Sequence, residues 1–349
     1  MIVLGINDGH CATAALLKDG EVLGCVSEER FTRNKNESGY PRLSIEWLLA
    51  SQRLKPQELD AIALAGEEAI EPAWFFRVTR DDAYIDEYLG LRDGGPGGRL
   101  REKLRRFFSK LSLTSEQRGK RPFTLAERHR AVREHLGVEE GCIHQVEHHT
   151  AHAAAAYWAS PYGAAGREAT ILTNDAAGDG LCATWSIGGR QGLKRLSASP
   201  SAAGSLGSFY SLVTLFLGMR QLEHEYKVMG LAPYAPEAGI KRSYEVFRQM
   251  IEFSPGDPPC FRWKVRRARF RYMMERLARH RFDWVAAAAQ SLLEEMLEEW
   301  AVLGLERAGS PRLACSGGVF MNVKANKRLS ELAQVEELYV LPSCGDESN

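Results

Sequence analysis

The sequence predicts an α/β fold of two duplicated lobes that face each other across a central cleft. At 349 residues the chain is longer than one average domain. An apolar run that ends in Asn-Asp occurs twice, at residues 2–8 and 169–175, and each copy leads through a glycine turn to Cys-Ala-Thr. Helical sequence follows both copies, which is the pattern of an internally repeated α/β unit.

The two copies match in the order of their features. In the first, the predicted strand at 2–7 is followed by a glycine turn, by a second strand that opens at 11–13, and by a glycine turn into a third strand. In the second, a slightly longer turn separates the first strand from the Cys-Ala-Thr at 182–184. Chance similarity is the alternative, but the shared order makes it the weaker one. We expect strand-end aspartates and glycines of both halves at the cleft, as in actin, hexokinase and Hsp70, where glycine-rich turns hold phosphates.

The remaining elements follow from apolar periodicity. We expect a first lobe at 1–160, with a charged helical insertion at about 70–135, and a second lobe at 161–349 that is truncated at its carboxy-terminal end. The basic stretch at 264–281 is interpreted as a solvated amphipathic helix rather than a nucleic-acid contact. Other predicted elements are helices at 43–51 and 284–304, and strands that end at 65, 315 and 342.

Composition narrows the range of partners. Lysine plus arginine and aspartate plus glutamate both number 45, so no net field favours nucleic acid or a membrane. The sequence has no apolar run of about 18 residues, so no transmembrane helix is expected. Seven cysteines are scattered without CxxC pairs, which indicates reduced thiols and a cytoplasmic protein.

The histidines of the sequence His-His-Thr-Ala-His at 148–152 are candidate metal ligands. His148 and His152 are four residues apart, so on a helix both imidazoles project from one face. About 20 residues on, a predicted buried strand delivers Asp175 at its end. Two imidazoles and a carboxylate suit a divalent metal. Two solvated histidines, or one that caps a helix, are the alternative.

Two later segments add polar groups after predicted strands. The strand at 312–315 is followed by Ser-Gly-Gly at 316–318 and a helix start, which offers free backbone N–H groups to a phosphate or ribose. The strand at 337–342 is followed by Asp346, a third carboxylate after a strand and beside a glycine. Both segments are expected to face the cleft.

Taken together, these motifs resemble the amino-terminal domain of the O-carbamoyltransferases of the NodU/CmcH type. The resemblance covers nearly all 349 residues and follows the same order. It rests on GINDGH at 5–10, SEERFTRNK at 27–35, HHTAHA at 148–153, NDAAGDG at 174–180, SLGSFY at 205–210, EYKVMGLAPY at 225–234, SGGVFMN at 316–322 and PSCGD at 342–346.

The resemblance implies a fold like that of the threonylcarbamoyl-transferring TsaD family, which belongs to the actin-like superfamily. In such proteins a metal, often iron, is held by the two histidines of HxxxH and by strand-end aspartates. On this sequence the corresponding ligands are His148, His152, Asp175 and Asp346. Imidazole and carboxylate suit Fe(II), which the resemblance favours, or Mn(II) or Zn(II), better than Mg(II).

The resemblance also implies a two-stage reaction. Carbamoyl phosphate is hydrolysed and its carbamoyl group is passed to ATP, and the resulting carbamoyl-adenylate then donates carbamoyl to a hydroxyl of a small-molecule or sugar acceptor. His10 is the expected general base, Lys35 the expected partner of phosphate or oxyanion, and Asp8 a third catalytic candidate. A structural turn histidine and an exposed loop lysine are the alternatives. Nucleotide-binding candidates are Gly178, Asp179, Gly180, Ser205, Gly207, Ser208, Lys227, Gly317, Gly318 and Asn322.

Family members continue past the position of Asp346 into a helix and a YrdC-like domain that forms carbamoyl-adenylate, whereas this sequence ends at Asn349. We therefore expect the transfer half of the enzyme, with a separate YrdC-like chain as a candidate partner. Two alternatives stay open. One is TsaD-like transfer of threonylcarbamoyl to tRNA, and the other is a non-catalytic nucleotide-binding module that needs a partner chain.

Overall fold

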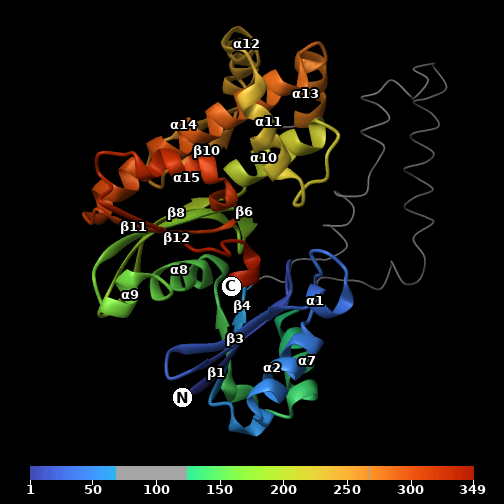
Figure 1. The fold of residues 1–349 in the computed structure, drawn as a ribbon, viewed down its shortest axis with the longest axis vertical. Helices are drawn as coiled ribbons and strands as arrows, with labels where there is room; N and C mark the ends of the chain where they lie inside the picture. Colours follow the sequence, from blue (N-terminus) through green and yellow to red (C-terminus); the bar gives the residue numbers. More distant parts are fainter. Residues whose placement is uncertain (68–123, 267) are drawn as a thin grey trace, which may run out of the picture.

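The computed structural model describes residues 1–67, 124–266 and 268–349. Two five-stranded sheets form two lobes, one below and one above the junction where the carboxyl terminus lies (Figure 1). The strand orders are β3-β2-β1-β4-β5 and β12-β11-β6-β7-β8. Read from β8, the second order repeats the first, so each lobe has three consecutive strands followed by two that return after a crossover.

The first lobe is a sheet packed against two helices. The antiparallel strands β1 to β3 are joined by β4 and β5, which run parallel to β1. Side chains of the helices α2 and α7 fill one core with the apolar side chains of the strands. The elements are β1 (Ile2–Asn7), β2 (Thr13–Lys18), β3 (Glu21–Ser27), α1 (Glu29–Thr32), α2 (Arg42–Gln52), β4 (Ala61–Ala65), α7 (Leu125–Leu136) and β5 (Ile143–Val146).

The second lobe is larger and has helices on both faces of its sheet. Helix α8 packs against β6 and β11, while α10 and α14 pack on the opposite side (Figure 1). The elements are α8 (His148–Trp158), α9 (Pro161–Ala165), β6 (Ala169–Gly178), β7 (Leu181–Gly189), β8 (Gly192–Pro200), α10 (Leu206–Phe216), α11 (Glu225–Leu231), α12 (Glu237–Arg248), β9 (Ile251–Ser254), β10 (Cys260–Trp263), α13 (Arg269–Leu277), α14 (Phe282–Ala308), β11 (Arg312–Ser316), α15 (Val323–Ser330) and β12 (Glu337–Val340).

The duplicated α/β fold predicted from the sequence is confirmed by the strand pairing. Asn7 pairs with Thr13 in the first hairpin, and Asn174 pairs with Ala183 in the second. In both lobes the first strand is antiparallel to the second and parallel to the strand that arrives after the crossover. The second hairpin differs by an irregular pairing between Asn174 and Gly178, where β6 carries extra residues.

The long helix α14 supplies much of the second core. Its side chains Trp300 and Leu297 are fully buried or nearly so, and the Trp300 ring lies 5.7 Å from that of Trp185 on β7. Burying large side chains contributes roughly 1.5–3 kcal/mol each. This packing fixes the sheet whose strand ends build the site described below.

Most of the helical insertion predicted at about 70–135, up to residue 123, lies outside the described residues. Its remainder is α7, which is part of the first core because Val132 and Leu136 are buried there. Thr124 begins α7 with a capping box, and Gly137 ends it at a φ of 63°.

The predicted division at residue 160 groups α8 with the first lobe, whereas α8 packs on the second sheet. Among the described residues, no helix has both the length and the apolar character needed to cross a membrane.

Candidate metal centre and substrate cleft

Helix α8 presents two histidines to the junction of the lobes. His148 and His152 lie one turn apart on the same face, as the spacing predicts, and both are buried. The Glu147 carboxylate accepts hydrogen bonds from the backbone N–H groups of His149, at 3.1 Å, and Thr150, at 2.8 Å. An anionic cap also interacts favourably with the helix dipole, so α8 starts at a defined residue with both imidazoles directed inward.

Asp175 lies in the irregular stretch of β6, where the chain bulges out of the ladder. Such bulges redirect a side chain away from the alternation of the strand. The start of α10 holds this stretch, because the hydroxyl of Ser205 donates to the Asp175 carbonyl at 3.0 Å and that of Ser208 donates to the Ala176 carbonyl at 3.3 Å. A Cβ at Gly207 would come within 2.7 Å of the Ala176 nitrogen, so only glycine fits there.

Asp346 comes from the opposite end of the chain, in the short 3-10 helix η5 (Asp346–Ser348). The side-chain amide of Asn7, at the end of β1, donates to the backbone carbonyl of Asp346 at 2.9 Å. Gly317 N–H donates to the Cys344 carbonyl at 2.7 Å and ties the same loop to the second sheet. Asp346 is therefore held by both lobes.

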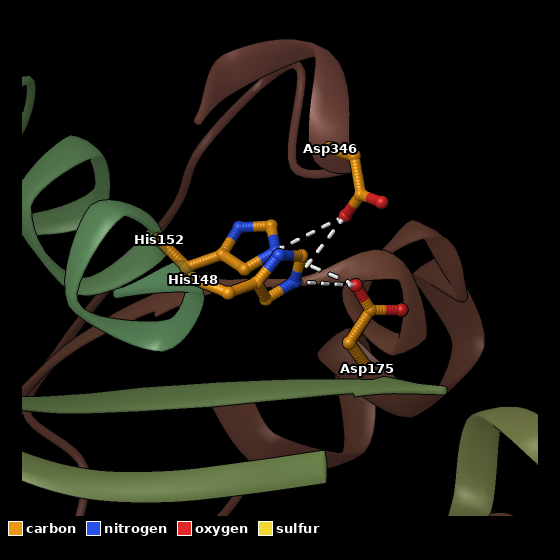
Figure 2. Close-up of side chains that lie close together, drawn as sticks. All are labelled: His148, His152, Asp175 and Asp346. Atoms are coloured by element: carbon orange, nitrogen blue, oxygen red, sulfur yellow. Dashed lines mark ion pairs between the residues drawn. The ribbon is translucent and has the colours of Figure 1, made fainter. Parts of the chain in front are cut away.

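These four side chains converge (Figure 2). Nε2 of His148 lies 3.5 Å from Oδ2 of Asp175 and 3.6 Å from Oδ1 of Asp346. Nε2 of His152 lies 3.4 Å and 3.3 Å from the same two oxygens. One ligand atom from each residue lies within 4.8 Å of those of the others. The structure thus brings together His148, His152 and Asp175 with Asp346, the fourth ligand that the family resemblance implies.

The carboxylates and imidazoles of the cluster shift one another's pKa values. Burial lowers the pKa of His152, but the adjacent carboxylates of Asp175 and Asp346 outweigh this effect and raise that pKa to about 9. Burial also lowers the pKa of His148, yet Asp346 and Asp175 leave that pKa raised. Burial raises the pKa of Asp175, while His148 and His152 bring it well below its usual range. A cation that binds here must displace protons from the imidazoles.

The donor set fits a divalent metal ion. Ligand atoms at the usual 2.0–2.2 Å from a shared ion are about 3.0 Å apart at right angles and about 3.4 Å apart in a tetrahedron, close to the four separations above. Nε2 of His148 and Oδ1 of Asp346 are buried and have no hydrogen-bond partner among the described residues. Two imidazoles and two carboxylates suit Fe(II), Mn(II) or Zn(II).

The neighbouring His149 differs from these ligands. Its Nδ1 lies 2.8 Å from the Thr173 hydroxyl, inside the second lobe. Burial and the adjacent His148 and His152 lower its pKa to about 3, so it stays neutral. Only the histidines four residues apart face the carboxylates.

A cavity of about 420 Å³ opens beside the carboxylates of Asp175 and Asp346, and both lobes line it. It contains the predicted catalytic residues His10 and Lys35 at its first-lobe side, and Asp175 and Asp346 at the other. Of the predicted nucleotide ligands, Gly207, Gly318 and Asn322 line this cavity. A cavity of this size accommodates a drug-sized ligand.

The other predicted nucleotide ligands lie outside the lining of this cavity. Ser205 and Ser208 hold the backbone beside Asp175, and Gly317 approaches Asn174 so closely that a Cβ would lie 2.3 Å from its carbonyl oxygen. Lys227 is exposed on α11, with its Nζ 5.7 Å from the ring centre of Tyr226. Gly178 ends β6, and Asp179 and Gly180 form the turn to β7. Gly178 and Asp179 line a narrower pocket together with Asp8 and His148.

Asp8, the third predicted catalytic residue, is engaged in an ion pair that sequence reasoning missed. The Arg128 guanidinium contacts both Asp8 oxygens, with Nε at 2.9 Å and Nη2 at 2.7 Å. It also donates to the carbonyls of Gly66 and Ala65, each at 2.6 Å. With each of its three nitrogens bonded to an acceptor and a side chain only 3% exposed, Arg128 neutralises Asp8. Asp8 therefore positions the end of β1.

A buried amide network on α14 was also missed, since only a helix was predicted there from the sequence. The Gln290 side chain exchanges hydrogen bonds with Asn322, both at 2.9 Å, and accepts one from the Tyr210 hydroxyl at 2.8 Å. Tyr210 and Asn322 both line the cavity. A glutamine within an apolar helical pattern was the available signal, because a buried amide needs partners.

The duplicated sheets and the cleft between them define a two-lobed actin-like fold. Full-length HypF in its phosphate- and nucleotide-bound form has a similar fold, with a TM-score of 0.52 and 11% sequence identity over 99% of this chain and 45% of that one. At this identity the likeness concerns the fold alone.

The sequence matches the family described as carbamoyltransferase N-terminus over residues 2–349, and the chain belongs to this family. It is 26% identical to the nodulation protein NolNO of Sinorhizobium fredii, over 97% of this chain and 44% of that protein. It is 25% identical to an uncharacterized protein of Methanocaldococcus jannaschii, over 99% of this chain and 55% of that protein. The chain thus spans about half the length of the curated relatives it matches.

Proposed function

We propose that this chain transfers a carbamoyl group from carbamoyl-adenylate to a hydroxyl of a small-molecule or sugar acceptor. The convergence of His148, His152, Asp175 and Asp346 beside a cavity lined by both lobes carries the proposal. Membership of the carbamoyltransferase family supplies the group that is transferred. ATP and carbamoyl phosphate enter the overall reaction through the formation of carbamoyl-adenylate.

In this proposal the four ligands hold one divalent metal, with Fe(II) favoured. The bound metal would act as a Lewis acid that stabilises negative charge on the carbamoyl carbonyl or on phosphate. The protein's part is to keep the Asp175 carboxylate ionised beside the buried imidazoles, which the lowered pKa of Asp175 supports. The start of α10 and the glycine at 207 keep Asp175 in place through the backbone contacts described above.

The transfer itself is an acyl substitution. The acceptor oxygen attacks the carbamoyl carbon, a new C–O bond forms, the bond to the phosphate oxygen breaks, and AMP leaves with the electron pair. His10 takes the proton of the acceptor hydroxyl, because it lines the same cavity as Asp175 and Asp346. Lys35, which also lines this cavity, balances the negative charge of the phosphate.

A direct test supplies the proposed substrate. Purified protein reconstituted with Fe(II), Mn(II) or Zn(II) is incubated with synthetic carbamoyl-adenylate and a panel of hexoses, amino sugars and hydroxylamine. AMP release and carbamoylated products are measured by mass spectrometry. We expect metal-dependent transfer, reduced about 10²–10⁴-fold in His10→Ala because a general base is lost.

The matched control is His144→Ala, which removes an exposed imidazole on β5 of the same lobe and should leave the rate unchanged. Equal rates for the wild type and His10→Ala would remove His10 from the mechanism. Metal-loaded protein that neither binds nor consumes carbamoyl-adenylate would contradict the proposed function.

A further inference from the structure

The turn between β6 and β7 contacts the metal-binding helix rather than the large cavity. Asp179 and Gly180 have positive φ angles of 48° and 77°, which closes the hairpin in two residues. Asp179 lies outside the lining of the cavity, although it was predicted as a nucleotide ligand. Its carboxylate is directed at two backbone N–H groups, one in each lobe.

The first of these N–H groups belongs to His148, the first residue of α8. It donates to Oδ2 of Asp179 at 2.7 Å. The Glu147 carboxylate accepts from the N–H groups of His149 and Thr150. The first three N–H groups of α8 are therefore bonded by two carboxylates, one from Asp179 and one from Glu147. The backbone of a metal ligand is thus bonded directly to Asp179, and Gly178 contacts the ring of that ligand. A Cβ at Gly178 would lie 2.1 Å from Cδ2 of His148.

The second N–H group belongs to Glu67, which follows β4 of the first lobe. It donates to Oδ1 of Asp179 at 2.9 Å and to Oδ2 at 2.8 Å. The residue before it, Gly66, is fixed from its own lobe, because its N–H donates to the Val146 carbonyl at 2.7 Å and its carbonyl accepts from Arg128 at 2.6 Å. The segment that Asp179 binds is therefore firmly attached to the first sheet.

We infer that Asp179 is a positioning residue that couples the first lobe to the metal ligand His148. A single carboxylate fixes the start of α8 and at the same time binds the end of β4, so a change in the relative position of the lobes is transmitted to His148. Groups behind metal ligands set ligand orientation, and their loss typically weakens metal binding about 10–100-fold. This inference deepens the proposed function and rests on its metal site.

The test compares Asp179→Ala and Asp179→Asn with Ser160→Ala in the full chain. Ser160 caps the neighbouring helix α9 through the N–H groups of Tyr162 and Gly163, so its loss removes a helix cap in the same lobe without a contact to the ligands. Metal-stripped proteins are titrated with Co(II), and the dissociation constant and the visible absorption spectrum are recorded. Residue-resolved hydrogen exchange is measured on the same samples, with the Gly66 amide as the internal reference.

We expect Asp179→Ala to weaken Co(II) binding about 10–100-fold and to change the shape of the Co(II) spectrum. Asp179→Asn should have an intermediate effect, because one amide oxygen can still accept from both N–H groups. Ser160→Ala should bind as the wild type does. The amides of His148 and Glu67 should exchange faster in Asp179→Ala while Gly66 stays protected.

Two results would overturn the inference while leaving the metal site intact. One is wild-type Co(II) affinity in Asp179→Ala, and the other is equal weakening in Ser160→Ala, which would mean general destabilisation. A wild-type protein that binds no Co(II) would instead overturn the proposed metal site and the inference together.

Discussion

The two lobes carry the same Asn-Asp pair where the regular pairing of their first strand ends, and they use it differently. In the first lobe Asp8 is bonded by the Arg128 guanidinium of α7 at 2.7 and 2.9 Å. In the second lobe Asp175 faces the imidazoles of His148 and His152 on α8 at 3.5 and 3.4 Å. The two aspartates are similarly buried, with side chains 12% and 15% exposed. The role of each aspartate therefore depends on the side chain that the neighbouring helix places beside it, an arginine of α7 or the histidines of α8.

The arginine partner prevents metal binding at Asp8, because a guanidinium does not lose its proton in proteins and offers no lone pair to a metal. Imidazoles leave the second site exchangeable, because they can release a proton and then bind a metal. We conclude that the duplication supplies two equivalent carboxylates, of which one is structural and the other serves the candidate metal centre.

The largest expected effect comes from breaking the structural pair. Arg128→Met leaves the Asp8 carboxylate and the carbonyls of Ala65 and Gly66 without their donor, and should lower the free energy of unfolding by about 3–5 kcal/mol. Urea denaturation measures this change. Removing both charges in Asp8→Asn/Arg128→Met should cost less than Arg128→Met alone, and Arg133→Ala, half-exposed on the same helix, should cost less than about 0.5 kcal/mol. A loss below 1 kcal/mol in Arg128→Met would refute a structural role for the first-lobe pair.

The second lobe should instead show a pH-dependent stability without metal. The pKa of His152 is raised from 6.5 to about 9 by its two carboxylates. Because this pKa is higher in the folded state, protonated His152 stabilises the fold, and the contribution is complete below the unfolded-state pKa of about 6.5. It is lost as the pH rises through about 9, which lowers the free energy of unfolding by about 3 kcal/mol.

Urea unfolding of metal-stripped protein between pH 6 and pH 10 measures this loss, with His152→Gln as the reference. The difference in stability between the wild type and His152→Gln should shrink across that window. A pH-independent difference would show that His152 does not hold a proton in the folded state.

A smaller effect distinguishes the two turns that follow the strand ends. Gly178→Ala places a methyl group against the His148 ring and should cost about 1–3 kcal/mol. It should also weaken metal binding. Gly9→Ala in the first lobe meets only Oδ1 of Asn7, at 3.2 Å, and should cost less than about 1 kcal/mol. Urea unfolding and Co(II) titration of both variants check this contrast, and equal effects would contradict it.

Local sequence patterns predicted much of this fold and part of the site. The duplicated Asn-Asp strand ends and the histidine spacing at 148–152 depend on short-range periodicity, which is visible in one sequence. Asp346 could be assigned to the same centre only through the family resemblance, because nothing local joins it to a helix about 200 residues earlier. Its position depends on the hydrogen bond from Asn7 across the two lobes.

The partners that sequence reasoning missed come from long-range packing. Arg128 is one of many arginines in a charge-rich stretch, and only the fold brings it to Asp8, 120 residues away. Ser205 and Ser208 were expected to bind nucleotide, whereas in the structure their hydroxyls bond the backbone around Asp175. Which N–H or carbonyl a hydroxyl reaches is set by packing, and the sequence alone does not specify it.

The second-lobe cluster is proposed to hold one divalent metal. Crystals of the protein soaked with Mn(II) or Fe(II), examined by anomalous diffraction at the metal edge, test it directly. We predict a single peak bonded to His148, His152, Asp175 and Asp346, and no peak at Asp8. Absence of a peak among these four residues at millimolar metal, or a peak bonded elsewhere, would rule out this metal site.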